Sequence, residues 1–414
     1  MTTSTNGDDT EIGYHYPIEK NDLNDLNNIV INDYKIISKI GSGRFSRVYK
    51  VEKNNELFAM KIYKSSSSYL KYFNNEIYNH NFIKDDPDYE TYIVKMLGDF
   101  TYNSQYGTHG IIIFELCGDN LAELLHNSDE GTLPEPIVKR IIHQTLNGLK
   151  LFHRKNLIHT DLKPDNLLLT KKHNLINDFK DIQVKISDLG SSLMENNIDT
   201  YSVGTNQYLP PEVIIQTDYD KSIDIWSIGN VIFELMTGDN LIDPDEYFDD
   251  EADESSEGEG EGEGEGEGEG EGEGEGEGNE ENSSCWSSNY SDNDDDECDD
   301  FEYVHLHLVL FHKIIGTIPK SLIKNGKYYD IFYRKSGVLN RNPTYIDKTD
   351  IETILNTQYS FHMENTANDL SDVLKFIFKY KPQDRPNIEK LLEHQWFSGN
   401  FDEQYKTLKK YISQ

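Results

Sequence analysis

Eleven consecutive Glu-Gly pairs, residues 257–278, are the feature that most limits how this chain of 414 residues can fold. Glycine leaves the unfolded backbone highly flexible and the alternating carboxylates repel one another, so this tract cannot form a packed core. Together with the acidic and Ser-rich sequence around it, the tract predicts a disordered acidic insert over residues 247–300. Lengthening a surface loop costs only about 0.6 kcal/mol per doubling, so one folded domain can continue on both sides of the insert.

Most of the net charge of −36 belongs to this insert. Between Asp243 and Glu302 the chain carries 29 of its 75 acidic residues and no Lys or Arg, which leaves 46 acids against 39 bases elsewhere, a net charge of −7. A charge of that size is ordinary for a soluble enzyme. The acidic segment argues against nucleic acid or an anionic membrane as a direct ligand, and it favours attraction to an arginine-rich partner.

Cysteine content and hydropathy indicate an intracellular protein. Cys117, Cys285 and Cys298 fit neither a disulfide framework nor a zinc cluster. No apolar run approaches 18 residues, and the first residues lack the basic and apolar regions of a signal peptide. We therefore expect the protein in the cytoplasm, the nucleus or both, with no membrane partner.

Hydrophobic patterning predicts two lobes of different structure. Alternating apolar residues predict five strands of an antiparallel sheet, and residues 70–82 predict one helix beside it; the strand segments are 34–40, 45–53, 57–64, 92–100 and 109–117. From residue 117 onward helical spacing dominates, as in 137–156 after Pro136 and in 223–236. The predicted fold class is α+β. A small β lobe spans 34–116 and a larger helical lobe 117–398, between a polar lead-in (1–33) and a tail (399–414).

A polar string after helix 137–156 carries the groups that phosphoryl transfer needs. In His-Thr-Asp-Leu-Lys-Pro-Asp-Asn, residues 159–166, the carboxylate of Asp161 can accept a proton from an attacking hydroxyl, and Lys163 can hold the transferring phosphate. The side-chain oxygen of Asn166 can bind a metal ion. Asp188, 22 residues further on and followed by Leu-Gly, supplies a second metal-binding carboxylate. A pair of strings at this spacing is a highly specific signal.

Segments in the β lobe fit the phosphates of ATP. Gly41, Ser42 and Gly43 lie between the first two strands, where glycines let backbone amides approach phosphates, and Val48 follows to cover the adenine. A hairpin turn alone would explain the glycines equally well. Lys61, 20 residues after Gly41, favours the phosphate-binding interpretation over the hairpin turn. A strand lysine taken alone is more often a surface residue.

The remaining nucleotide contacts are predicted from position. Glu76, on the helix, is the expected ion-pair partner of Lys61, which holds the α- and β-phosphates. Glu115 and Cys117 lie in the connector between the lobes, where they are expected to contact the adenine, and Phe114 is expected at the back of that pocket.

These motifs resemble those of the SR-protein kinases, a family that phosphorylates serines in arginine–serine repeats. Residues 157–166, LIHTDLKPDN, are similar to the I-I-H-T-D-I-K-P-E-N of that family, and further similarities occur at 13–15, 107–109, 188–190, 224–239 and 326–337. Lys163 and Thr205 are marks of serine/threonine kinases rather than tyrosine kinases. The resemblance implies a bilobal protein-kinase fold, serine/threonine kinase activity, ATP and Mg²⁺ as cofactors, a protein substrate rich in Arg and Ser, and a monomer.

The chain departs from this family at its substrate platform, where T-R-Q-Y-R-S is replaced by TNQYLP, residues 205–210, without either arginine. Val304, His305 and Leu306 stand where the family has acidic residues. Thr160, which the SR-protein kinase string shares, stands where most protein kinases have an arginine before the catalytic aspartate. A phosphate on residues 191–211 would therefore have one partner fewer, and we expect activity without it. A kinase of another specificity, a catalytically weak scaffold and an acidic docking protein remain alternatives.

Four further residues are expected to be structural. Glu212 at the end of the segment that Asp188 opens is predicted to pair with Arg385, and Asp224 and Trp226 are predicted to lie in the core. Removing one partner of a buried pair costs about 3–5 kcal/mol, so this pair would support the fold and not the chemistry.

Overall fold

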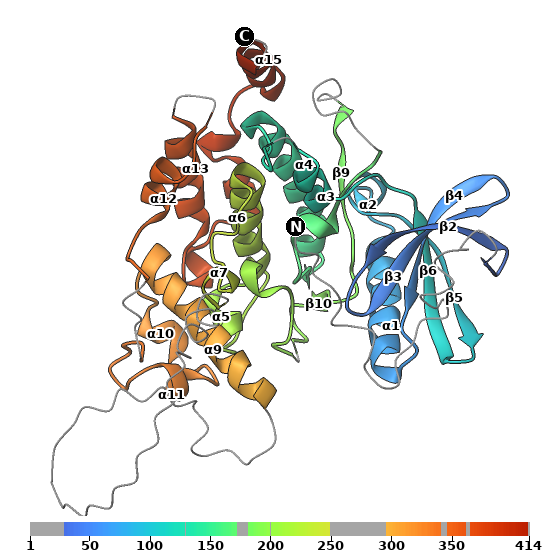
Figure 1. Cartoon of the computed structure of the whole chain (residues 1–414), viewed down its shortest axis with the longest axis horizontal. Helices are drawn as coiled ribbons and strands as arrows, with labels where there is room; N and C mark the ends of the chain where they lie inside the picture. The colour runs from blue at the N-terminus through green and yellow to red at the C-terminus, as the bar shows by residue number, and fades with distance from the viewer. Residues whose placement is uncertain are drawn as a thin grey trace, which may run out of the picture.

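The computed structural model of the chain describes residues 29–128, 130–171, 181–198, 200–248, 295–340, 346–361 and 365–412. The Glu-Gly tract and most of the predicted lead-in lie outside these ranges. The described residues form the two lobes that the sequence predicts, a sheet with one long helix beside it and a larger helical lobe (Figure 1).

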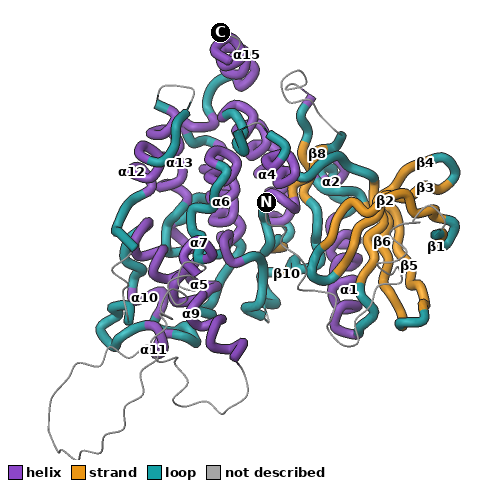
Figure 2. Tube along the Cα trace, in the orientation of Figure 1, coloured by secondary structure: helices purple, strands orange, loops and turns teal. Residues whose placement is uncertain are grey.

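Six antiparallel strands form the sheet of the small lobe, in the order β1-β2-β3-β4-β6-β5 (Figure 2). The strands are β1 (Val30–Ile31), β2 (Tyr34–Ser42), β3 (Ser46–Lys53), β4 (Glu56–Tyr63), β5 (Met96–Ser104) and β6 (Gly107–Glu115). Five of them correspond to the predicted strands, and the two-residue β1 is an addition that falls inside the predicted lead-in. β5 begins later than predicted, because residues 89–92 form the short helix α2 (Tyr89–Tyr92).

Helix α1 (Ser67–Ile83) follows β4 in the chain and presents a face of mixed polarity to the rest of the molecule. Its buried side chains recur at helical spacing and include polar ones: Phe73, Glu76, Asn79, His80 and Ile83. The ring of Phe73 packs directly on β6 at Gly110, where a Cβ atom would collide with it. This close approach fixes the helix against the sheet and points its polar side chains toward the junction of the lobes.

The large lobe is built around two long helices. Its elements are α3 (Leu121–His126), α4 (Glu135–Arg154), β7 (Leu157–Ile158), β8 (Leu167–Leu169), β9 (Val184–Ile186), β10 (Leu193–Met194), α5 (Pro211–Ile214), α6 (Ser222–Thr237), α7 (Asp245–Phe248), α9 (Asp295–Leu310), α10 (Lys320–Ile323), α11 (Tyr329–Phe332), α12 (Ile351–Thr357), α13 (Thr366–Ile377), α14 (Ile388–Leu392) and α15 (Phe401–Ile412). Helices α4 and α6 match the predicted segments to within two residues at each end.

Helix α6 is the centre of the large lobe. Almost all its residues are buried, and it ends at Gly238, whose φ of 86° is the left-handed conformation that commonly closes a helix. Trp226 on this helix is fully buried and makes edge contacts with the rings of Phe311 and Phe378, at centroid distances of 5.6 and 4.8 Å. Trp226 therefore has the core position that the sequence predicted.

Two predicted boundaries differ from the structure. Helix α9 begins at Asp295, so the last acidic residues of the predicted insert are helical and the insert ends earlier than expected. An acidic first turn suits the positive end of the helix dipole, which composition alone does not reveal. The predicted tail contains helix α15, which lies against α4, where the ring of Phe401 contacts that of His143 at 6.1 Å.

Among the described residues, no helix combines the length and the apolar character needed to cross a membrane.

Candidate active site

A cluster of charges joins the two lobes at Lys61, with Lys61 and Glu76 buried and Asp188 partly exposed. Its ammonium lies 2.9 Å from a carboxylate oxygen of Glu76 on α1 and 2.9 Å from Oδ1 of Asp188 in the large lobe. Burial alone would lower the pKa of Lys61, but Asp188 and Glu76 outweigh it and hold this pKa well above its usual value. Burial would likewise raise the pKa of Asp188, yet Lys61 lowers it. The ion-pair partner predicted for Lys61 is thus in contact with it.

Tyr63 completes this cluster and was not anticipated from the sequence. Its hydroxyl donates a hydrogen bond to Oε2 of Glu76, and its ring packs edge-on against Phe73. Lys61 and Tyr63 are two residues apart on β4, so both side chains point to the same face of the sheet. Only the packing of α1 on that face shows that the hydroxyl reaches a carboxylate.

The loop of residues 159–166, which we call the catalytic loop, meets the platform in one ring of contacts among Asp161, Lys163 and Thr205. The hydroxyl of Thr205 donates to Oδ1 of Asp161 at 2.8 Å and accepts from the Lys163 ammonium at 2.8 Å, while Lys163 lies 3.7 Å from Asp161. The side-chain amide of Asn166 donates to the backbone oxygen of Asp161 at 2.7 Å. Because the amide nitrogen is engaged in this way, the amide oxygen is the atom of Asn166 that can ligate a metal ion.

Asp224 supports the backbone of this loop from α6. Its fully buried carboxylate accepts from the backbone amides of His159 and Thr160, each at 3.0 Å, and contacts His153 at 2.9 Å. Thr160 has a φ of 74° and Asp188 a φ of 59°, conformations that strain non-glycine residues by about 1–3 kcal/mol. The hydrogen bonds from Asp224 hold the first of these strained positions, which agrees with the structural role predicted for it.

Neutral side chains anchor the start of the segment that Asp188 opens. Asn75 donates to the backbone oxygens of Gly190 and Ser192, at 2.8 and 3.0 Å, and Asn79 donates to that of Leu189 at 2.9 Å. Thr160, which stands where an arginine is usual, donates its hydroxyl to the backbone oxygen of Ser191 at 3.1 Å. These amides were not recognised in the sequence, because asparagine on a helix has many other uses.

The far end of the same segment is fixed by the predicted pair of Glu212 and Arg385. Two parallel contacts of 2.5 and 2.9 Å join the guanidinium to the carboxylate, and both side chains are fully buried. The guanidinium also lies over the ring of Trp226, 4.9 Å from its centroid. This interpretation from the sequence is confirmed.

The glycine loop folds over the junction of the lobes. Gly41 and Ser42 belong to β2, while Gly43 lines the cavity below and donates its amide to the backbone oxygen of Ser46 at 2.9 Å. Phe45, two residues after Gly43, stacks on Tyr72 of α1, with ring centroids 4.1 Å apart. The loop is therefore held to α1 by an aromatic contact.

Apolar side chains surround the connector predicted to contact adenine. One cluster contains buried Ala59 and Phe114 with the partly buried Val48, Cys117 and Leu168. Burial raises the pKa of the Cys117 thiol to about 12, so the thiol is neutral and suits an apolar site.

Glu115 of the same connector differs from the other predicted contacts. Its side chain does not reach into the cluster but accepts from Lys185 at 2.5 Å and from the backbone amide of Lys95 at 2.7 Å. Only the backbone of Glu115 could contact a nucleotide base.

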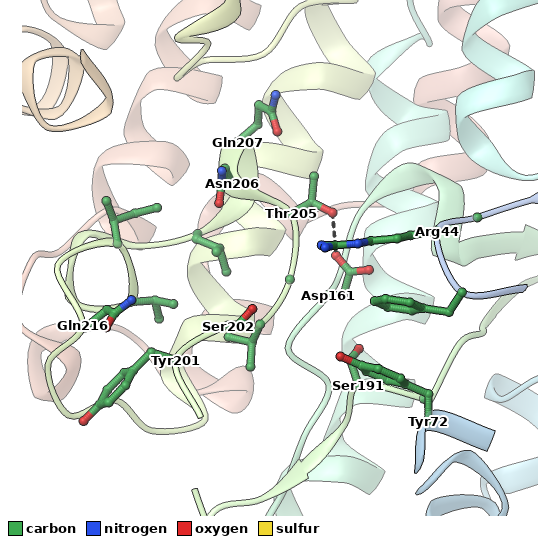
Figure 3. Close-up of a pocket in the computed structure, with 18 of the residues that line it drawn as sticks. Arg44, Tyr72, Asp161, Ser191, Tyr201, Ser202, Thr205, Asn206, Gln207 and Gln216 are labelled. Carbon is green, nitrogen blue, oxygen red and sulfur yellow. Dashed lines mark hydrogen bonds between the residues drawn. The ribbon is translucent and has the colours of Figure 1, made fainter. Parts of the chain in front are cut away.

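A cavity of about 1100 Å³ begins at this junction and extends over the platform (Figure 3). Gly43, Arg44, Lys61, Asp161 and Asp188 line one end of it. In Figure 3, Arg44 enters from the glycine loop opposite Thr205, Asn206 and Gln207 of the platform. The cavity thus places the catalytic loop between the glycine loop and a long groove.

These residues fit a magnesium nucleotide. Mg²⁺ prefers oxygen ligands and keeps several positions for water and phosphate, and Asp188 with Asn166 offers two protein oxygens. The buried Lys61 provides a fixed positive charge for phosphates, and the cluster around Cys117 provides an apolar site of the kind that an adenine ring needs.

Comparison with known proteins gives one matching domain family and three similar relatives. Residues 34–260 match the protein kinase domain. The serine/threonine-protein kinase SRPK of Physarum polycephalum is 26% identical over 438 residues, which cover 93% of this chain and 89% of that protein. The serine/threonine-protein kinase AFC3 of Arabidopsis thaliana is 25% identical, over 89% of this chain and 82% of its own. The probable serine/threonine-protein kinase dyrk2 of Dictyostelium discoideum is 26% identical over 94% of this chain but only 35% of its own length.

Proposed function

The chain belongs to the protein kinase family and is a protein serine/threonine kinase, and from this premise we propose that its substrates are arginine- and serine-rich proteins. Protein kinases in general act on proteins and use ATP with Mg²⁺. The observation that carries the proposal for the reaction is the ring of Asp161, Lys163 and Thr205, because it holds an ammonium beside a carboxylate that lines the cavity.

We assign the proton transfer to Asp161. Its Oδ1 already accepts a hydrogen bond from the hydroxyl of Thr205, so the carboxylate is oriented to accept one from a substrate serine as well. Lys163, 3.7 Å away, would neutralise charge on the transferring phosphate. Thr205 keeps both side chains in place and is a positioning residue.

The other polar residues of the site are proposed to hold the nucleotide. Bound Mg²⁺ supplies a positive charge that stabilises the charge developing on the phosphates. Asn166 and Asp188 would ligate it through their side-chain oxygens, and Lys61, held by Glu76, would supply a positive charge to the phosphates.

The remaining nucleotide-binding residues are proposed from position. The loop Gly41, Ser42 and Gly43 would cover the phosphates, and Val48 with Cys117 and the backbone of Glu115 would hold the adenine.

Charge and attachment of the insert support the proposed substrate class. Asp245 on α7 accepts from Gln207 of the platform at 2.8 Å, and the hydroxyl of Tyr303 on α9 also bonds to it. Helices α7 and α9 flank the insert, and α9 lines the cavity that contains Asp161, so the acidic segment 243–302 with its 29 carboxylates is joined to the chain beside that cavity. From its composition, a Glu-Gly tract of 22 residues would have an r.m.s. reach of roughly 25 Å, and its charge would attract a basic substrate.

The proposal is tested by phosphate transfer from ATP to three serine peptides of equal length, one arginine–serine, one proline-directed and one acidic. We expect the arginine–serine peptide to have the highest kcat/KM, with Asp161→Asn as the matched inactive control. A preference for the proline-directed or the acidic peptide would contradict the substrate class but leave the kinase activity standing. No transfer to any peptide would favour a scaffold or an acidic docking protein.

A further inference from the structure

The cavity that contains Asp161 continues into a groove with a different chemistry. Its far half is formed by three segments distant in sequence, the platform, α9 and the turn into α11. We call it the aromatic groove, and its walls are Tyr201, Val203, Leu209, Val213, Ile214, Phe301, Tyr303, Val304, Tyr328 and Ile331. Figure 3 shows Tyr201 and Gln216 at the end of the cavity away from Asp161.

Charge distinguishes the two ends of the cavity. Among its described lining residues the carboxylates are Asp161 and Asp188, both at the catalytic end, and the charged side chain of the groove end is Lys327. The Lys327 ammonium lies 5.1 Å from the centroid of the Tyr328 ring. Asp245, behind the wall, is bonded to Gln207 and Tyr303. An arginine side chain in the groove would lose water without gaining a carboxylate partner among these described lining residues, which is unfavourable.

Contacts among its walls show that the groove is preformed. The rings of Phe301 and Tyr328 pack edge to face with centroids 5.7 Å apart. Gln216 donates to the hydroxyl of Tyr328 at 3.1 Å and joins that wall to the platform side. A fixed groove binds a complementary side chain without first having to order itself.

We propose that the aromatic groove binds a bulky apolar side chain of the protein substrate, located within a few residues of the serine that is phosphorylated. The argument for this occupant is continuity: a polypeptide whose serine reaches Asp161 has neighbours about 3.3 Å apart per residue, and the same cavity leads them into the groove. This inference rests on the proposed function and narrows it. An uninterrupted repeat of Arg and Ser lacks the side chain that the groove accepts, so substrates combine a basic stretch with an apolar residue.

The test is a positional scan with the purified full chain and ATP. Peptides carry one serine in an arginine-rich sequence, with Leu, Phe, Ala, Arg or Asp placed in turn at each of three positions on either side of it. We expect Leu or Phe at one side to raise kcat/KM about 10- to 100-fold over Ala, mainly through KM, with Arg at that position no better than Ala.

Variants of Val304 connect this preference to the groove. Val304→Asp should abolish the preference for Leu and Phe and make Arg the favoured residue at the same position, and Val304→Thr, which keeps the shape, should weaken the preference. Val338→Asp is the matched control, because Val338 is 58% exposed and does not line the cavity. It should keep the wild-type preference.

The outcomes separate this inference from the proposed function. Equal kcat/KM for the Leu, Ala and Arg peptides would overturn the groove proposal, while any transfer would leave the kinase standing. A preference that survives both Val304 variants would also overturn it. Transfer that requires the apolar residue but not the arginines would support the groove and refute the arginine–serine class. A flat scan with specific activity that rises with enzyme concentration would overturn the proposal in favour of a second copy in the groove.

Discussion

Replacing Glu234 with glutamine should stabilise the protein, and more strongly at high pH. Glu234 on α6 accepts a hydrogen bond of 2.6 Å from the hydroxyl of Tyr208. Burial raises the pKa of Glu234 from its usual 4.5 to about 7; the hydrogen bond from Tyr208 opposes this, and Asp165 makes a smaller contribution that raises the pKa. An acid with a raised pKa holds its proton more tightly in the folded state, so stability falls as the pH rises from 4.5 toward 7.

The size of the effect follows from this shift. A shift from 4.5 to about 7 corresponds to about 3 kcal/mol of destabilisation once Glu234 is ionised, and about 2 kcal/mol of it develops between pH 5.5 and pH 8. Glutamine keeps the acceptor for Tyr208 but carries no charge. Glu234→Gln should therefore gain about 2 kcal/mol relative to wild type between these two pH values.

Urea unfolding at pH 5.5 and pH 8, followed by tryptophan fluorescence, measures this difference. Glu352→Gln is the matched control, because the Glu352 side chain is 56% exposed and its pair with Lys375 is a surface contact of little energetic value. A stability difference between Glu234→Gln and wild type that is the same at both pH values, or that declines at pH 8, would refute the reasoning.

Three further predictions concern activity. Tyr63→Phe removes one donor from the buried Glu76 carboxylate, a hydrogen bond worth about 1.5–3 kcal/mol, and should raise KM for ATP about 10-fold or more with a smaller change in kcat; an unchanged KM in steady-state kinetics would show that Glu76 holds Lys61 without help. Bacterially expressed, phosphatase-treated protein should be active, because Thr160 and neutral amides anchor the activation segment; strict dependence on phosphorylation within residues 191–211 would contradict this. Deleting residues 257–278 should lower kcat/KM for an arginine–serine peptide about 10-fold at low salt, with a smaller loss at high salt because charges are screened over about 10 Å at 0.1 M. If the deletion variant has the same kcat/KM as wild type at both salt concentrations, the insert does not contribute to substrate attraction.

Motif spacing pointed to the residues that we propose for the chemistry. Lys61, Asp161, Asn166 and Asp188 lie in short strings whose neighbours are themselves informative, and the two lobes follow from hydrophobic periodicity. The sequence also indicated the pair of Glu212 and Arg385, which the structure contains.

Other parts of the site depend on contacts between segments distant in sequence. Asn75 and Asn79 act through backbone oxygens more than 100 residues away, and nothing in their local pattern distinguishes them from surface asparagines. The local pattern shows Tyr63 only as a strand residue, and its contact with Glu76 depends on how α1 packs on β4. The aromatic groove was visible in the sequence only as missing platform arginines and missing acids near Val304, because its walls meet only in the folded chain.

The same limit applies to the boundary of the insert. Acidic composition predicted disorder up to residue 300, yet α9 begins at Asp295, since an acidic stretch can also form the first turn of a helix. Composition indicates that an acidic segment can be disordered or can begin a helix, and contacts in the fold decide between the two.

The central claim, that this chain transfers phosphate with Asp161 as the base, is tested most directly by radiolabelled ATP with wild type and Asp161→Asn on the same serine peptide. Asn keeps the size of the side chain and can still accept from Thr205, so nucleotide affinity should be retained in a binding assay while transfer falls about 10²–10⁴-fold. Near wild-type transfer by purified Asp161→Asn would contradict the account.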